Sequence, residues 1–153
     1  KNKIYSIHEP HTQCIAKGKE SKQYEFGNKT SIVKTRKSGI IIGALAFKEN
    51  IYDGVTLEPQ LEQVERLTNH QPESGIVDRG YRGKNIVNGT KIISPKKLPA
   101  STNNYQKQKA RKQFRARAGI EPVIGHIKHD HRMIRNYLSG ELGDTLNTLL
   151  AAM

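Results

Sequence analysis

The chain has 153 residues, and its 26 lysines and arginines against 14 aspartates and glutamates give a formal net charge of +12. This length fits one domain or part of one, and the positive charge favours a polyanionic partner, most commonly nucleic acid. A single cysteine excludes an internal disulfide framework and fits a reducing cytoplasm, and no apolar run approaches the roughly 20 residues of a transmembrane span.

The first 22 residues are polar and basic, and we expect at most a short extended piece at residues 3–7. His8, His11 and Cys14 follow at intervals of three, and these residue types are zinc ligands. The usual set of four ligands is not completed, and a proline interrupts the stretch. We therefore favour a loop of unrelated side chains over a zinc module.

Two strands are predicted next. Residues 23–35 partly alternate and carry β-branched and aromatic side chains, which is typical of a strand. Residues 40–47 are almost continuously apolar, as in a strand covered on both faces. The turn-forming residues 36–39 between them predict an antiparallel hairpin.

An amphipathic helix is predicted after this hairpin, with Thr56 as its cap. Its apolar face is formed by Leu57, Leu61, Val64 and Leu67. The opposite face carries Glu58, Gln60, Glu62, Glu65 and Arg66. We expect the apolar face to pack on the sheet and the helix to end at residues 69–72.

The most informative stretch begins at Gly75, where a short β-branched run ends on Asp78 and is followed at once by Arg79, Gly80 and further basic residues. In open α/β sheets, ligands and catalytic groups lie at the carboxyl ends of strands. A carboxylate among cations can hold a metal ion next to a phosphate. The alternative is a turn in which a solvated Asp78 acts only as a cap.

Less distinctive elements follow. Residues 82–89 predict a short turn or helix ending at Gly89, and residues 91–94 predict a further strand, which Pro95 closes. Residues 96–118 are the most basic part of the chain. Such a run is usually a solvated face, but its place between two candidate acids favours a surface that contacts the phosphate backbone.

Residues 106–135 are helical in composition, and at intervals of three, four and seven they carry Phe114, Arg117, Glu121 and Lys128. These intervals return to one helix face. Gly119 and a nearby proline predict a kink or restart near residue 119, after which Glu121 and Lys128 share a face.

Two features lie near the C-terminal end of the sequence. His126, His129 and His131 invite a metal site, but a basic helix facing DNA explains them more simply. Residues 140–152 predict an amphipathic helix whose leucines complete the core.

The order of these elements resembles the DDE transposases of bacterial insertion sequences, in particular the IS4/IS5-like group. The resemblance covers nearly the whole chain and depends on several motifs together. These are Tyr24 to Lys29, Asp53-Gly54-x-Thr56-Leu57, Asp78 to Gly83, and Phe114-x-x-Arg117-x-x-x-Glu121 with Lys128. Phe114 stands where the family pattern has tyrosine.

The resemblance implies an α/β fold of the RNase H-like type, with a mixed five-stranded sheet flanked by helices. Asp78 would be the second catalytic acid and Glu121 the third. The first acid would lie on a strand before residue 24, and no aspartate precedes Asp53. We therefore expect residues 1–153 to be a single partial catalytic domain, truncated at both ends and without its first strand.

The same resemblance implies Mg²⁺, with Mn²⁺ as a substitute, held by Asp78 and Glu121. It implies DNA as the partner, both transposon ends and target, a homo-oligomer when full length, no membrane, and a place in the bacterial cytoplasm with the nucleoid. Arg117 would contact DNA or pair with an active-site acid. The residues expected to bind DNA are Arg79, Arg82, Lys107, Lys109, Arg111, Lys112, Arg115, Arg117, Lys128 and Arg132.

Two other functions remain open at this point. One is a catalytically inactive, DNA-binding remnant of a transposase, which the absence of a first aspartate favours. The other is an RNase H-like nuclease unrelated to transposition, which the Arg117 to Lys128 tract disfavours.

Overall fold

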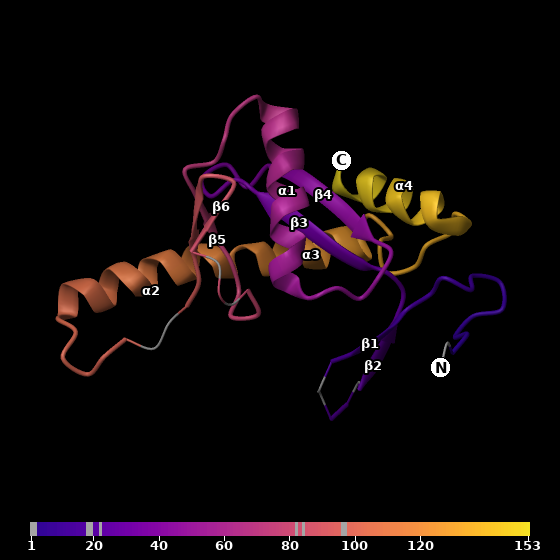
Figure 1. The fold of residues 1–153 in the computed structure, drawn as a ribbon, viewed down its shortest axis with the longest axis horizontal. Helices are drawn as coiled ribbons and strands as arrows, with labels where there is room; N and C mark the ends of the chain where they lie inside the picture. The colour runs from indigo at the N-terminus through magenta and orange to yellow at the C-terminus, as the bar shows by residue number, and fades with distance from the viewer. Residues whose placement is uncertain (1–2, 18–19, 22, 82, 84, 96–97) are drawn as a thin grey trace.

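The computed structural model describes residues 3–17, 20–21, 23–81, 83, 85–95 and 98–153, which form a mixed α/β molecule (Figure 1). The strands are β1 (Cys14–Ala16), β2 (Tyr24–Phe26), β3 (Lys29–Lys34), β4 (Ile41–Phe47), β5 (Ser74–Ile76), β6 (Ile86–Val87) and β7 (Thr90–Ile93). The helices are α1 (Asp53–Thr68), α2 (Asn104–Ala118), α3 (Ile120–His129) and α4 (Gly140–Ala152).

The described strands pair in three separate sheets, and not in the single five-stranded sheet that we expected. β1 pairs with β2 and β3 with β4, both antiparallel, while β7 lies between a parallel β5 and an antiparallel β6. The predicted strand at residues 23–35 is divided, because the chain turns at Gly27, whose φ is 134°. The β3–β4 hairpin itself is confirmed.

Helix α1 begins four residues earlier than predicted, at Asp53. Thr56 is not its cap but lies in the first turn, where its Oγ1 donates to the carbonyl of Asp53 at 2.7 Å. The predicted apolar face is buried at Leu57, Leu61 and Val64. Leu67, which we assigned to the same face, is exposed.

Gln60 was assigned to the outer face of α1, but both Gln60 and Gln63 are buried. Gln63 Oε1 accepts from the backbone N–H of Ala44 at 2.8 Å, and Gln63 Nε2 donates to the carbonyl of Ala44 at 2.9 Å. The amide thus pairs with β4 as another strand would. This explains why a polar side chain faces the sheet.

The core lies between α1 and the three-stranded sheet. Leu57, Leu61, Val87 and Ile92 are buried there in one cluster. Val87 belongs to β6, where we expected a turn or helix. The sequence Asn88-Gly89 instead makes a two-residue hairpin turn, with φ of 46° and 74°, and these values suit the right-handed twist of paired strands.

The long C-terminal helix is interrupted at Gly119, as predicted. Asn103 caps α2 by accepting from the N–H of Gln106 at 2.8 Å. Pro122 is the third residue of α3, where its missing N–H has no intrahelical partner to lose. Helix α3 ends at His129, earlier than the expected residue 135.

Helix α4 spans residues 140–152, as predicted, but packs by small side chains. Its buried residues are Gly143, Thr148 and Ala151, whereas Leu142 is 71% exposed. The leucines therefore do not complete the core as we expected. Helices α1 and α4 both contact β4, and α2 extends away from the other helices (Figure 1).

Candidate active site

Asp78 lies just beyond the carboxyl end of β5, as predicted. The N–H of Val77 donates to the carbonyl of Ile93 at 3.0 Å, which continues the parallel ladder up to the residue before Asp78. The N–H of Tyr81 donates to the Asp78 carbonyl at 3.2 Å and closes a turn. Because Val77 and Tyr81 both pack against the core, the turn is held on each side of Asp78.

Arg117 brings the two candidate acids together. Its Nη2 lies 3.0 Å from Asp78 Oδ2 and 3.2 Å from Glu121 Oε1. The side chains of Asp78 and Glu121 are 54% and 57% exposed. Residues far apart in the sequence thus meet at the end of a strand and at the break between two helices.

Glu121 lies in the first turn of α3, where the helix dipole favours a carboxylate. Lys128 lies on the same helix seven residues later, so the predicted shared face of these two residues is confirmed. Lys34 also reaches this region, because its Nζ lies 3.5 Å from the position that a Cβ would take at Gly119. We did not expect Lys34 among the site residues.

A further carboxylate, that of Asp53, lies against the turn that contains Asp78 and Gly80. Its Oδ2 is 2.5 Å from the position that a Cβ would take at Gly80. Lys29 Nζ forms an ion pair with Asp53 and also donates to the carbonyl of Ile51 at 2.7 Å. Lys29 and Asp53 each belong to a motif that the family resemblance used. Their place in those motifs could have predicted that they lie near the candidate site.

The donor set suits a hard cation. Magnesium is commonly held by one or two carboxylates, with waters and substrate phosphates as the other ligands. Asp78 and Glu121 supply such carboxylates, both accessible to solvent. Across the described residues, no three His, Cys, Asp or Glu side chains are grouped closely enough to hold a metal on their own.

The residues expected to bind DNA lie mostly on α2, which has no buried residue and no acidic residue. Those that are exposed are Arg79, Lys109, Arg111, Lys112, Arg115 and Arg132. Those that are partly buried are Lys107, Arg117 and Lys128. Arg82 lies outside the described residues.

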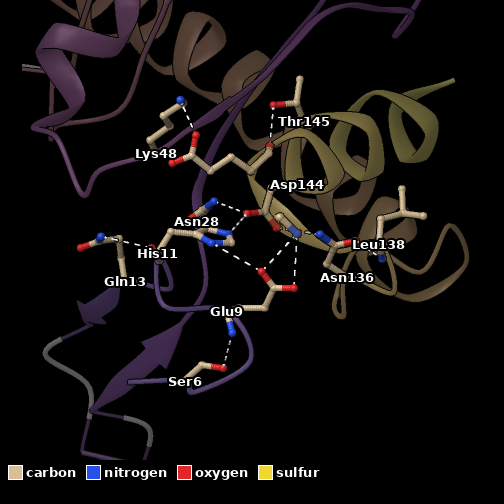
Figure 2. A network of polar contacts seen from close by, with 12 residues as sticks. Ser6, Glu9, His11, Gln13, Asn28, Lys48, Asn136, Leu138, Asp144 and Thr145 are labelled. Atoms are coloured by element: carbon tan, nitrogen blue, oxygen red, sulfur yellow. Dashed lines mark hydrogen bonds and ion pairs between the residues drawn. The ribbon is translucent and has the colours of Figure 1, made fainter. Parts of the chain in front are cut away.

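His11 belongs to a polar network that joins the N-terminal segment to α4 (Figure 2). Its Nε2 lies 2.8 Å from Asp144 Oδ2, and its Nδ1 lies 3.4 Å from Glu9 Oε2. Glu9 also accepts from the N–H of Gly140 at 3.1 Å. We expected the stretch from His8 to Cys14 to be a loop, but its last residue, Cys14, is the first residue of β1.

Of the three C-terminal histidines, His126 forms a hydrogen bond within its own helix end. His126 Nδ1 lies 2.5 Å from Asp130 Oδ2, and this hydrogen bond lowers the pKa of the Asp130 carboxyl. The pair lies one turn apart at the end of α3 and is exposed.

In the part of the chain that the structure describes, no helix has the length and apolar character needed to cross a membrane. No curated protein and no solved structure is significantly similar to the chain. The family model of the transposase DDE domain matches residues 6–153, almost the whole length, which confirms the resemblance seen in the motifs. The chain therefore belongs to the DDE-domain transposases, as a member of the IS4-like family, and its domain is of the kind that carries out DNA cleavage and strand transfer in transposition.

Proposed function

We propose that Asp78 and Glu121 are two catalytic acids of a metal-dependent transposase that cleaves and joins DNA at the ends of an insertion sequence. The observation that carries this proposal is the meeting of both carboxylates at one nitrogen of Arg117. Two exposed acids, one just after a parallel strand and one in the first turn of a helix, have the chemistry and the access that a metal-bound phosphate needs.

Asp78 and Glu121 would hold Mg²⁺ or Mn²⁺, which when bound activates a water or a DNA 3′-hydroxyl and stabilises the leaving oxygen. The protein fixes the two carboxylates by different means. The core holds the Asp78 turn through Val77 and Tyr81, and the first turn of α3 holds Glu121. A third acid would come from the strand that the family places before residue 24, in an RNase H-like sheet.

The basic residues of α2 would bind the DNA backbone and orient the cleaved strand. Helix α2 carries Lys107, Lys109, Arg111, Lys112, Arg115 and Arg117. Since each neutralised phosphate releases counterions, this surface would give affinity that falls steeply with salt. Lys128, on the face of Glu121, would contact the backbone near the scissile bond, and the full-length protein would act as a homo-oligomer on paired transposon ends.

One observation favours a second candidate, a DNA-binding remnant without activity. In the described part of the chain, no third carboxylate joins Asp78 and Glu121 in a group that could hold a metal. Such a remnant would use the same basic surface of α2 and would not depend on either acid.

Metal-dependent cleavage of DNA separates the two candidates. The protein is prepared together with the segment that carries the first catalytic acid in the family. The variants Asp78→Asn and Glu121→Gln, and the control Glu65→Gln at an exposed position, are then compared with it on a plasmid that carries the element. We expect cleavage with Mg²⁺ or Mn²⁺ that each active-site variant lowers by about 10³-fold or more, with DNA binding nearly unchanged. Cleavage retained by Asp78→Asn or Glu121→Gln would refute the assignment, and cleavage by none of the proteins would favour the remnant.

A further inference from the structure

Arg117 differs from the other cations of α2. Its side chain is only 30% exposed, whereas Lys109, Arg111, Lys112 and Arg115 are exposed. It also forms ion pairs with two carboxylates, one from the turn after β5 and one from α3. Within the described residues, no other cation of α2 has such a pair.

A single nitrogen makes both contacts. Because Nη2 lies 3.0 Å from Asp78 Oδ2 and 3.2 Å from Glu121 Oε1, the same guanidinium group contacts both oxygens. A magnesium ion binds its oxygen ligands at about 2.1 Å. A metal that used these two oxygens as ligands would therefore compete with Arg117 for both of them.

The charges lead to the same conclusion. Two neighbouring carboxylates repel each other unless a cation lies between them, and here Arg117 supplies that cation. A guanidinium cannot be neutralised by losing a proton, so a metal must displace it. Both carboxylates are more than half exposed, so the exchange does not require unfolding.

We propose that Arg117 is an internal counter-ion that competes with the divalent metal for Asp78 and Glu121. This inference rests on the proposed function, since it takes the same two acids as the metal site. It adds that the chain holds its acids in a metal-resistant pair until a phosphate gives Arg117 another anion. DNA and metal then bind cooperatively. A DNA phosphate draws Arg117 away from the carboxylates that the metal needs, and a metal on the carboxylates frees Arg117 to bind a phosphate.

A structural tie between α2 and the Asp78 turn would predict the opposite. If Arg117 only holds α2 in place, its removal loosens Asp78 and Glu121 relative to each other, and metal affinity falls or does not change. If Arg117 competes with the metal, its removal raises metal affinity in the absence of DNA. The direction of the change decides between these two roles.

The test is a titration of the chain with Mn²⁺ in the absence of DNA. Binding is measured in two ways, by the heat in calorimetry and by the electron paramagnetic resonance signal of free Mn²⁺. Arg117→Gln is compared with Arg115→Gln, which removes the same charge from an exposed position of the same helix. We expect Arg117→Gln to tighten Mn²⁺ binding by about five-fold or more, the range of ordinary coupling between sites. Arg115→Gln should change it less than about two-fold, because an exposed charge is screened by solvent and salt.

A second readout follows Arg117 itself. In the chain with ¹⁵N-labelled arginine, Mg²⁺ should shift the side-chain Nε–H signal of Arg117 and leave that of Arg115 unchanged.

Two controls accompany these measurements. Circular dichroism of the Arg117→Gln variant shows whether the helices are retained. The Arg117→Lys variant keeps the positive charge, so it should bind Mn²⁺ more weakly than the Arg117→Gln variant does.

The outcomes separate this inference from the proposed function. Equal Mn²⁺ affinity for the Arg117→Gln and Arg115→Gln variants would overturn the inference and leave the metal site in place. Asp78→Asn and Glu121→Gln should each weaken Mn²⁺ binding in the Arg117→Gln background. If they do not, the metal is not held by these acids, and both the inference and the proposed function fail.

Discussion

Two regions of the molecule meet at the candidate site, and they are built in opposite ways. The region of α1, β5 and β7 has an apolar cluster that includes Leu57, Leu61 and Ile92. Helix α2 has no buried residue at all and carries a dense row of cations. Asp78 belongs to the first region and Arg117 to the second.

The difference shows what each region contributes. Apolar burial fixes the Asp78 turn, because Val77 and Tyr81 are part of the packed region. Helix α2 has no fully buried side chain, so the repulsion between its like charges is offset by little apolar burial. Substitutions in the first region should therefore lower stability, and substitutions in α2 should lower DNA affinity with little effect on stability.

The largest effect should come from the core. Leu61→Ala removes a buried side chain from the cluster under the Asp78 turn, and we expect it to lower the free energy of unfolding by about 2–5 kcal/mol. Leu142→Ala is the control, because Leu142 is exposed on α4, and it should change stability by less than about 0.5 kcal/mol. Urea unfolding measures both, and equal losses would show that this cluster is not the core.

A crowding substitution tests the turn more locally. Gly80→Ala would place a Cβ 2.5 Å from Asp53 Oδ2, so either the turn or the Lys29–Asp53 pair must shift. We expect a loss of about 1–3 kcal/mol together with weaker cleavage. Gly75→Ala is the control on β5, since its Cβ would meet Ile92 at an ordinary 3.6 Å.

A second substitution shows whether Asp53 is the cause. Adding Asp53→Ala to the Gly80→Ala variant removes the crowded oxygen and should restore part of the lost stability. If the double variant is as unstable as the sum of the two single variants, the crowding does not involve Asp53.

The same chemical change should have unequal effects in the two regions. Gln63→Leu leaves the N–H and carbonyl of Ala44 without their partner, at a cost of about 1–3 kcal/mol for a buried unsatisfied group. Gln108→Leu alters an exposed position of α2 and should be close to neutral. Thermal unfolding compares the two variants, and a neutral Gln63→Leu would mean that water or a rearranged strand replaces the amide.

Local patterns predicted the elements whose cause is local. The hairpin of β3 and β4, the break at Gly119 and the place of Asp78 after an apolar strand all follow from neighbouring residues. The division of residues 23–35 was not predicted, because the alternating pattern continues through Gly27 and only the backbone conformation there shows that the chain changes partner.

Contacts between distant residues could not be predicted in the same way. A glutamine such as Gln63 is counted as polar until its partner on β4 is known, and the apolar leucines of α4 were assigned to a core that small residues fill instead. The pairing of Arg117 with Asp78 was one of two expectations for that arginine, and only the fold could choose between them.

The smallest effect on stability should come from α2, and it is the one that tests binding. Lys112 is exposed on a helix without buried residues, so Lys112→Gln should change the free energy of unfolding by less than about 0.5 kcal/mol. If Lys112 neutralises one phosphate, the slope of log affinity for duplex DNA against log salt should fall by about 0.9. Fluorescence anisotropy at several salt concentrations measures that slope, with Lys37→Gln, an exposed lysine in the turn between β3 and β4, as the control for charge alone. An equal fall in both variants would mean that α2 attracts DNA only through the net charge of the molecule, whereas a fall confined to Lys112→Gln would identify this helix as a surface that contacts the backbone directly.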